Sequence, residues 1–533
     1  MKWYVTFFGM LISVVLVRAA ESLIITTSIP AQPALIRNDK NSLARVVVDM
    51  PPGQTDLLQV IHFSIDGSTE LESLTLQAGD DIGAFKPKII GNIQNNIKQS
   101  VSIRCDAKLQ SGKNVFWLKG KLKPAANLLK TISAKCTLVE TKMGRISAND
   151  LSPSVRQRIG IALRKHMDDG VHTYRIPALT TTTKGTLLCV YDMRRRKSRD
   201  LQEDIDIGLS RSTDGGATWE PQRVIMDMGK YGGLPEEQNG CSDPGIIVDQ
   251  RTGDIFCFAV WMNGKPGKHQ WNADGSEPGF EIGKSAQFMM VRSKDDGRTW
   301  TKPENLTSQL KKEAWWLFAP SPQHGINLKD GTLVMPSQGR DEKGREFSTI
   351  MTSTNRGASW IIGQPAIIGS SECQAVELED GSIMLNMRNE KDRAKEQDRL
   401  RLVYVTKDRG KTWFPHESNR KSLIEPRCNG SLIRVDYQEA GKKKHVLLFA
   451  NPHSQKGRTH QTIQISFDEG KTWPKSHHLL LDEGRGAGYA SLTRVDEDHI
   501  GIVYEGSQAH LVFEKIPLRE LLYPKSNHTV KDK

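Results

Sequence analysis

Short runs of alternating apolar and polar residues follow one another along most of this chain of 533 residues. Runs such as "ARVVVDM", "ESLTLQA" and "SVSIRCDAKL" have the two-residue period of β-strands that bury one face. Clusters of Gly, Asn, Asp and Pro separate the runs, and no long stretch has the 3.6-residue period of a helix. The pattern therefore predicts an all-β protein.

The runs fall into two groups, and the length also favours two or three domains. Residues 21–150 hold seven runs at near-regular spacing, which is typical of a β-sandwich. This unit is a candidate carbohydrate-binding domain. The segment "ISANDLSPSVRQRIG", residues 146–160, is rich in turn formers and is predicted to be a linker. Residues 155–525 form the second, larger all-β unit.

One octapeptide is written five times in the larger unit. The copies are "STDGGATW" at 212, "SKDDGRTW" at 293, "STNRGASW" at 353, "TKDRGKTW" at 406 and "SFDEGKTW" at 466. In a tight turn the Asp or Asn can accept backbone amides, the Gly supplies a positive φ, and the Trp packs beside the hairpin. A unit that recurs about every 50 to 80 residues predicts a β-propeller.

We expect six blades, because one blade can lack the motif or be closed from both ends of the chain. The five turns are predicted to be structural. They lack the ligand spacing of a calcium loop, so no metal is expected there.

The first twenty residues differ from the rest. A Lys at position 2 precedes an apolar run from Trp3 to Val17, and "VRAA" follows. This is the pattern of a secretory signal peptide, residues 1–20, cut after Ala19 or Ala20. The alternative is an anchor that stays in place, but the run is short for a stable membrane span. We expect an exported protein, either periplasmic, on the outer surface or secreted.

Composition narrows the partners. The formal net charge is +12, which favours anionic partners such as mucins. Predicted export argues against nucleic acid. The seven Cys are widely spread without CxxC spacing, so we expect buried thiols rather than a zinc site or a disulfide framework, although Cys105 and Cys136 are close enough in sequence to pair.

The octapeptide is the Asp box, and "YRIP" at 174–177 stands ahead of its first copy. With these motifs, residues 155–520 resemble the exo-α-sialidases (neuraminidases) of glycoside hydrolase family 33, especially secreted bacterial members. The resemblance implies hydrolysis of terminal α-linked sialic acids from glycoproteins, mucins, gangliosides and oligosaccharides, with retained configuration. It implies no metal and no organic cofactor.

Sialic acid carries a carboxylate, which guanidinium groups bind as planar bidentate donors. The resemblance implies three such groups, and Arg175 in "YRIPAL", Arg388 in "LNMRN" and Arg458 in "QKGRTHQ" match them. Glu505 in "IVYEGS" matches the family Glu that braces the first of them.

Most retaining glycosidases attack with a carboxylate, but sialidases use Tyr. A neutral phenol avoids repulsion by the substrate carboxylate, although ionising it at neutral pH costs about 4 kcal/mol. A neighbouring base must offset that cost. The resemblance assigns the nucleophile to Tyr489 in "GRGAGYASL" and the base to Glu372 in "SSECQAVELE".

The acid that protonates the leaving oxygen is expected in "YDMRRRKSRDLQEDIDI". In the family an Arg at a strand end is followed five or six residues later by an Asp, which gives Arg194 and Asp200. The local competitors are Asp192, Glu203 and Asp204.

Two further positions are candidates for the pocket. Asp243 in "NGCSDPGI" matches a family Asp near the N-acyl or ring-hydroxyl side of the sugar. Trp261 or Trp271, on a long loop, lines an apolar pocket or simply packs within the loop.

Other activities use the same residues. A trans-sialidase or an anhydro-forming enzyme differs only in the loops around the acceptor. A sialic-acid-binding, lectin-like propeller would carry a damaged nucleophile or acid, whereas all three catalytic residue types are present here.

Overall fold

The predicted all-β character is confirmed by the computed structural model, which describes residues 23–79, 88–263, 276–391 and 399–524. The signal peptide and Trp271 lie outside the described residues. The helical segments are short: α1 Thr307–Leu310, α2 Leu518–Leu522, and the 3₁₀ turns Ser68–Glu70, Asp168–Gly170, Glu236–Gln238 and Lys475–His477. Across the described ranges, no helix is long and apolar enough to cross a membrane.

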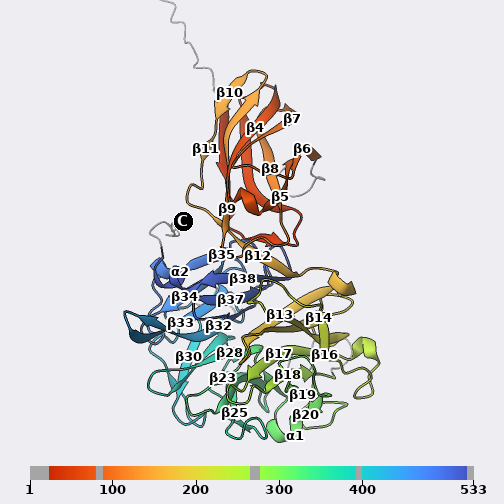
Figure 1. Ribbon diagram of the computed structural model, residues 1–533. Coiled ribbons are helices and arrows are strands. Elements are labelled where there is room, and N and C mark those ends of the chain that lie inside the picture. Colours follow the sequence, from red (N-terminus) through yellow and green to blue (C-terminus); the bar gives the residue numbers. More distant parts are fainter. Residues whose placement is uncertain (1–22, 80–87, 264–275, 392–398, 525–533) are drawn as a thin grey trace, which may run out of the picture.

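The N-terminal part consists of two sheets that share one hydrophobic core, and Figure 1 shows them projecting from the rest of the molecule. The first sheet has the order β11-β1-β3-β8-β5-β6, and β4, β7, β9 and β10 form the facing sheet. The strands are β1 Ile24–Ser28, β2 Ala34–Ile36, β3 Asn41–Met50, β4 Asp56–Asp66, β5 Leu71–Ala78, β6 Lys88–Gln94, β7 Ser100–Leu109, β8 Gly112–Leu122, β9 Thr131–Thr141, β10 Gly144–Ser147 and β11 Asn149–Asp150.

The rest of the chain folds into successive antiparallel sheets in chain order. The first is β13 Thr173–Thr181, β14 Leu187–Arg194, β15 Ile205–Ser212 and β16 Arg223–Met226. The second is β17 Cys241–Val248, β18 Ile255–Trp261, β19 Gln287–Ser293 and β20 Glu304–Asn305. A fifth strand, β22 Gln323–His324, pairs parallel with β17 at the edge of this second sheet. The third sheet contains β21 Leu317–Pro320, β23 Ile326–Asn327, β24 Leu333–Arg340, β25 Glu346–Ser353, β26 Ile361–Ile362 and β27 Ile367–Ile368.

The next two sheets have four strands each. They are β28 Ser370–Glu377, β29 Ile383–Asn389, β30 Leu402–Thr406 and β31 Phe414–Pro415, then β32 Ser431–Glu439, β33 Lys442–Pro452, β34 Gln461–Ser466 and β35 Leu479–Asp482. In the sixth, β36 Ala490–Arg494, β37 His499–Tyr504 and β38 Leu511–Pro517 pair in order, and β12 Gln157–Arg164 completes the set from the other end of the larger unit.

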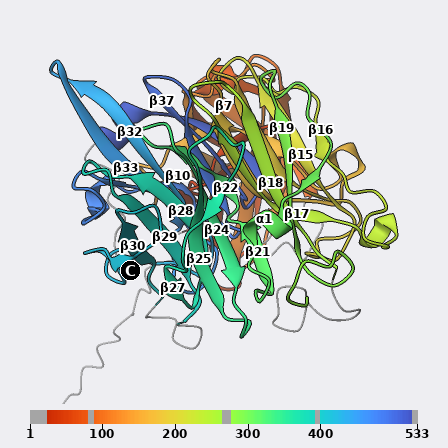
Figure 2. The ribbon, with the colours of Figure 1, turned by 90° about the horizontal axis from the view of Figure 1, so that it is seen from below.

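Strands of successive sheets contact one another in sequence. β13 contacts β17, and β17 contacts β21, β23 and β24 of the third sheet. β23 and β24 contact β28, β28 contacts β32, β32 contacts β36, and β36 contacts β13. Figure 2 shows the sheets following each other from yellow-green (β15, β16) through green (β24, β25) to cyan and blue (β28 to β33).

The five repeated turns have the predicted geometry. In the second copy, the amide and hydroxyl of Thr299 donate to Asp295 over 2.9 and 2.6 Å, and Gly297 has a φ of 77°. The amide bond recurs at Asp214, Asn355, Asp408 and Asp468. The hydroxyl bond recurs at the three Asp residues, whereas the Asn355 side-chain amide donates to the Ser359 hydroxyl. The structural interpretation of these turns is confirmed.

The prediction that residues 146–160 form a linker was wrong, because much of this segment belongs to strands. Its end belongs to β12, which pairs with β9 of the N-terminal part and with β38 of the sixth sheet. The cause is the alternation of Ile159, Ile161 and Leu163, whose side chains are buried in the shared core. One nine-stranded sheet therefore runs through both parts of the molecule.

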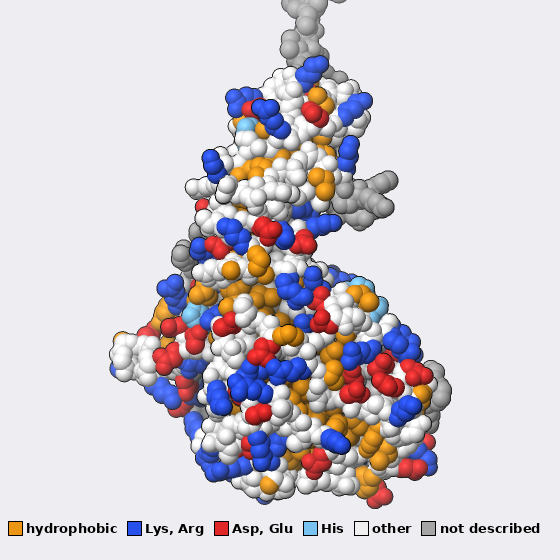
Figure 3. Space-filling model, turned by 45° about the vertical axis from the view of Figure 1, so that its right-hand side comes forward, with side chains coloured by type: hydrophobic (Ala, Val, Ile, Leu, Met, Phe, Trp, Pro, Cys, Tyr) orange, Lys and Arg blue, Asp and Glu red, His pale blue; other side chains and the backbone are white. Residues whose placement is uncertain are grey.

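The distribution of basic side chains and the state of the seven Cys agree with the predictions made from composition. On the face shown in Figure 3, Lys and Arg side chains occur over both the N-terminal part and the larger unit. All seven Cys are free and buried, as expected, and Cys105 and Cys136 are not paired.

Candidate active site

Irregular pairing at the start of the first strands positions several candidate residues. The register of β13 shifts between Arg175 and Ala178, that of β17 between Ser242 and Gly245, and that of β28 between Ser370 and Cys373. In β13 and β17 the shift contains a Pro, which cannot donate to the ladder. Bulges of this kind re-aim side chains. Asp243 and Glu372 lie within these shifts, and Arg175 borders the shift in β13.

Arg175 is held by Glu505, which directly follows β37. Its Nε donates to Glu505 Oε1 over 2.6 Å, and the amide of Ile176 donates to the same oxygen over 2.8 Å. The other oxygen, Oε2, accepts the amide of Tyr489 over 2.9 Å. Burial alone would lower the pKa of Arg175, but the charge and hydrogen bond of Glu505 raise it above its ordinary value. Glu505 thus fixes both the guanidinium and the backbone that carries Tyr489.

Tyr489 and Glu372 are in direct contact. The Tyr489 hydroxyl donates to Glu372 Oε1, and Arg388 Nη1 donates to Glu372 Oε2 over 2.7 Å and to the Tyr489 oxygen over 3.3 Å. Burial and the Glu372 charge raise the pKa of Tyr489 well above its ordinary value, while Arg388 and Arg458 act in the opposite direction. The phenol therefore stays protonated in this site, with its proton aimed at Glu372.

Arg175 and Arg458 flank the ring of Tyr489. Their guanidinium carbons lie 5.5 and 5.4 Å from its centroid. Arg458 comes from the loop after β33, and its two Nη atoms donate to the carbonyls of Ala487 (2.7 Å) and Arg427 (3.2 Å). With Arg388 above the hydroxyl, three guanidinium groups surround one phenol.

Arg194 lies between two carboxylates. It bonds Asp192 Oδ2 through Nε (3.2 Å) and Nη2 (3.0 Å), and its Nη2 lies 3.3 Å from Asp200 Oδ1. Asp192 is fully buried, whereas the Asp200 side chain is 30% exposed. Burial raises the pKa of Asp192 to about 6, opposed by Arg194 and assisted by the Asp200 charge. Of these two carboxylates, only Asp200 can reach a molecule in solvent.

Asp243 is buried beside this group. Its amide donates to Asp192 Oδ1 over 3.2 Å, and Gln338 Nε2 donates to its Oδ2 over 3.2 Å. Burial, followed by the charges of Asp200, Glu372 and Asp192, raises the pKa of Asp243 well above its ordinary value. Burial and the neighbouring carboxylates therefore favour the protonated form of Asp243, in which a carboxyl can donate a hydrogen bond as well as accept one.

The other sequence candidates are placed elsewhere. Glu203 pairs with Arg196 (3.3 Å) and Lys197 (2.6 Å), and the Asp204 carbonyl accepts the amide of Arg195. Trp261 is completely buried in a hydrophobic core and bonds Asn239, so it packs within the fold and lines no pocket.

The sequence analysis did not identify Gln338 as a partner of Asp243, nor Asp192 as the residue that holds Arg194 in place. Asp192 had a signal, because residues two apart on a strand share a face, as Asp192 and Arg194 do on β14. Gln338 had none, since its contact to Asp243 joins positions that are 95 residues apart.

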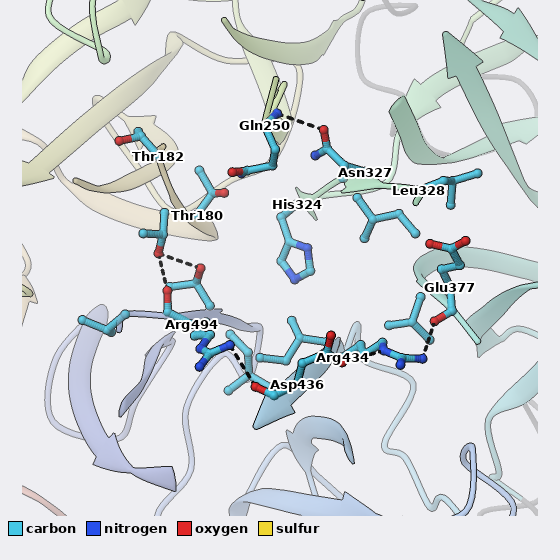
Figure 4. Close-up of a pocket in the computed structure, with 18 of the residues that line it drawn as sticks. Thr180, Thr182, Gln250, His324, Asn327, Leu328, Glu377, Arg434, Asp436 and Arg494 are labelled. Atoms are coloured by element: carbon cyan, nitrogen blue, oxygen red, sulfur yellow. Dashed lines mark hydrogen bonds and ion pairs between the residues drawn. The ribbon is translucent and has the colours of Figure 1, made fainter. Parts of the chain in front are cut away.

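A separate cavity of about 700 Å³ opens at the far ends of the first strands. Figure 4 shows Thr180, Gln250, Asn327, Glu377, Arg434 and Arg494 around His324, and these six residues lie on or next to strands of six successive sheets. Thr181 lies six residues along β13 from Arg175, which is about 20 Å at 3.3 Å per residue. The candidate catalytic residues therefore occupy the opposite end of the strands from this cavity.

In the described residues, no group of three or more His, Cys, Asp or Glu side chains could hold a metal ion. The chemistry of the candidate site comes from a phenol with a carboxylate partner, three guanidinium groups and a half-exposed carboxyl. This set can bind an anion, attack an electrophilic carbon and protonate a leaving group.

Comparisons with known proteins agree with this chemistry. Residues 185–504 match the family model described as a BNR repeat-like domain. The chain is 37% identical to a sialidase of Bacteroides fragilis over 97% of this chain and 98% of the relative, and 32% identical to a sialidase of Micromonospora viridifaciens over 63% and 50%. The solved structure of a Hadza microbial sialidase superposes with a TM-score of 0.86 at 34% identity, covering 93% of this chain and 99% of that one.

Proposed function

The chain belongs to the bacterial sialidases with BNR repeats and is a glycoside hydrolase of the exo-sialidase class; from that premise we propose that it cleaves terminal α-linked sialic acids with retention through a Tyr489 nucleophile. The observation that carries the proposal is the bond from the Tyr489 hydroxyl to Glu372, surrounded by Arg175, Arg388 and Arg458.

The three guanidinium groups bind the substrate carboxylate, which places the anomeric carbon over the phenol. Tyr489 attacks that carbon as its proton passes to Glu372, and Asp200 protonates the departing glycosidic oxygen. Because burial and the Glu372 charge raise the pKa of Tyr489, proton transfer accompanies attack instead of preceding it.

Water completes the cycle. The Asp200 carboxylate takes a proton from water, and the water oxygen attacks the anomeric carbon. The bond to Tyr489 breaks, and its oxygen recovers the proton from Glu372. Two displacements leave the configuration unchanged.

Asp243 and Arg194 have a binding role in this proposal. Arg194 Nη2 lies 3.3 Å from Asp200 Oδ1, and the Asp243 amide donates to Asp192, so both residues lie next to the proposed acid. We assign them to the N-acyl or ring-hydroxyl groups of the sugar, in terminal sialic acids of glycoproteins, mucins, gangliosides and oligosaccharides.

We also propose that the six sheets form one closed six-bladed propeller. Two observations support it. Strands of successive sheets contact each other in a cycle that leads from β13 through β36 back to β13, and one cavity is lined by segments from all six sheets. β12 then closes the ring as the outer strand of the sixth blade, so the first and last parts of the unit share a sheet.

The test is release of free sialic acid from a fluorogenic α-sialoside. Wild type turns over, and Tyr489→Phe loses about 10³-fold or more in kcat, because the attacking oxygen is gone. Tyr404→Phe is the matched control, since Tyr404 lies on β30, the third strand of its sheet, away from the candidate site. Proton NMR of the first product should show the α-anomer.

Other outcomes identify other functions. A Tyr489→Phe variant within tenfold of wild type refutes the nucleophile. An anhydro sugar, or transfer to added lactose in preference to water, indicates an anhydro-forming enzyme or a trans-sialidase. Binding of the sialoside without turnover by folded wild type indicates a lectin-like propeller.

A further inference from the structure

Arg388 is held by a second carboxylate in addition to Glu372. Its Nη1 donates to Glu372 Oε2 over 2.7 Å, while its Nε lies 2.8 Å from Glu390 Oε1. Glu390 directly follows β29, which carries Arg388, and residues two apart along a strand face the same side. The Glu390 side chain is buried, so this ion pair is little screened by solvent.

Glu390 is itself fixed from the other side. Arg427 Nη2 donates to Glu390 Oε2 over 2.6 Å, and the Ser371 hydroxyl donates to Glu390 Oε1 over 3.1 Å. The Arg427 carbonyl also accepts Nη2 of Arg458 over 3.2 Å. Arg427 therefore connects two of the three guanidinium groups. Its side chain holds Glu390, which contacts Arg388, and its backbone carbonyl holds Arg458 directly.

The arrangement parallels the support of Arg175. Glu505 holds Arg175 from behind and takes no part in proton transfer, so Arg175 stays in place through the reaction. Glu372 cannot hold Arg388 in the same constant way, because Glu372 is the proposed base and loses its negative charge when it accepts the proton of Tyr489. A second carboxylate that takes no part in the proposed proton transfer can keep Arg388 in place, and Glu390 lies 2.8 Å from its Nε.

We propose that Glu390, anchored by Arg427, is the positioning residue of Arg388. This inference rests on the proposed function and deepens it. Glu390 holds the Arg388 guanidinium for the substrate carboxylate, and it offsets part of the Arg388 charge at the Glu372–Tyr489 pair. Without Glu390, Arg388 collapses onto Glu372 and binds substrate less well.

The charge effect is observable in the pH dependence of the reaction, because Arg388 contacts both Glu372 and Tyr489. The groups that face Tyr489 are Glu372, Arg388, Arg458, Cys428 and Arg175. The groups that interact with the Arg388 charge are Glu372, Glu390, Glu425, Arg458, the Cys428 thiol and the Tyr489 phenol. Replacing Glu390 with a neutral residue makes the field at the pair more positive, so protonation of the pair requires lower pH.

The experiment is steady-state kinetics of Glu390→Gln on the fluorogenic α-sialoside across pH 4–9. We expect KM to rise by about tenfold while kcat falls less than threefold, since ground-state binding is what is lost. The acid limb of kcat/KM should move to lower pH by about 0.5 to 1 unit. A purely structural role would lower the active fraction and move neither KM nor the limb.

Two more variants separate charge from reach. Glu390→Asp keeps the charge, so it should restore the pH limb while KM stays partly raised. Arg427→Met removes the anchor, should raise KM by a smaller factor, and should be non-additive with Glu390→Gln in a double-mutant cycle. Glu379→Gln is the control, because it breaks an exposed ion pair with Arg434, a residue that lines the far cavity.

The outcomes distinguish this inference from the proposed function. If wild type turns over, Tyr489→Phe does not, and Glu390→Gln matches wild type in KM and acid limb, only the role of Glu390 is refuted. If folded wild type lacks turnover, calorimetric binding of 3′-sialyllactose is compared instead. Equal Kd values for wild type and Glu390→Gln then overturn the inference, and a Kd raised about tenfold supports it. If Glu390→Gln fails to fold, Arg427→Met decides by the same criteria.

Discussion

At the scale of single residues, two carboxylates share Arg194 yet differ in what they can do. Asp192 is fully buried and bonds Arg194 twice, so it orients the guanidinium. Asp200 has 30% of its side chain exposed and meets Arg194 at 3.3 Å. A general acid must reach the leaving oxygen, and only Asp200 has that access.

This difference predicts a leaving-group effect for Asp200→Ala. On sialyllactose, whose sugar hydroxyl leaves poorly without a proton, the variant should lose about 10²- to 10⁴-fold in kcat/KM. On the fluorogenic sialoside, whose leaving group needs little help, the loss should be at least tenfold smaller. Release of free sialic acid from both substrates measures the effect.

Glu203→Gln is the matched control for this prediction. Glu203 pairs with Arg196 and Lys197, so its variant should stay near wild type on both substrates. Equal losses by Asp200→Ala on the two substrates would mean that Asp200 positions other groups and donates no proton.

At the scale of elements, the turns that stabilise each sheet and the candidate catalytic residues lie in different places. The repeated turns join the third and fourth strands, whereas the candidate residues lie at the start of first strands or near the ends of second strands. The turns hold the sheets in shape at a distance from the chemistry. Changes in a turn should therefore alter stability before activity.

Asp295→Ala tests that separation. Asp295 accepts the amide and hydroxyl of Thr299, and these bonds lower its pKa to about 2. Removing the acceptor should cost about 1–2 kcal/mol, in the range of a lost helix cap, and lower Tm by roughly 2–4 °C. The kcat on the fluorogenic sialoside should stay unchanged.

Asp295→Asn is the control, because Asn355 already accepts the Ser359 amide over 2.9 Å in the third copy of the turn. It should keep most of the wild-type Tm. A fall in kcat at unchanged Tm would show that the turn acts on the site.

The sequence predicted the parts of the site that depend on residue type and local pattern. Arg175, Tyr489 and Glu372 lie in recognisable motifs, and the Asp and Gly of the repeat dictate their own turn. The contacts of Gln338 with Asp243, and of Arg427 with Glu390, join distant segments that only the assembled sheets bring together. The periodicity of the sequence likewise predicted strands, but it did not predict that residues 157–164 form a strand that joins the two parts. The partners of that strand, β9 and β38, lie in other segments of the chain.

At the scale of the whole molecule, β12 joins the N-terminal sheets to the sixth sheet, and a buried acid lies on the neighbouring strand. Glu514, on β38, is fully buried, accepts the Tyr504 hydroxyl over 2.8 Å, and lies 3.5 Å from Nε of Arg158 on β12. Burial raises the pKa of Glu514 to about 7, against the effects of Arg158 and Tyr504. The junction between the two parts thus contains an acid that is neutral in mildly acidic solution.

The sign of its effect on stability follows from the raised pKa. The folded value is about 7 and the ordinary value 4.5, so the folded protein binds the proton more tightly. The stability linked to this proton is fully present below about pH 4.5 and is lost as pH rises through 7. The loss is at most about 3 kcal/mol at 1.36 kcal/mol per unit.

Glu514→Gln keeps the shape and remains neutral at every pH, so it removes that loss. We expect its Tm to match wild type at pH 5 and to exceed it by several degrees at pH 8, with kcat/KM unchanged at both. Glu520→Gln is the control, because Glu520 pairs with the same Arg158 but is 40% exposed and should give no gain that depends on pH. If Glu514→Gln instead lowers Tm at pH 8, Glu514 is ionised there and its attraction to Arg158 stabilises the junction. The difference in Tm between variant and wild type, followed by scanning calorimetry from pH 5 to 8, therefore decides whether the join between the two parts weakens as the solution becomes alkaline.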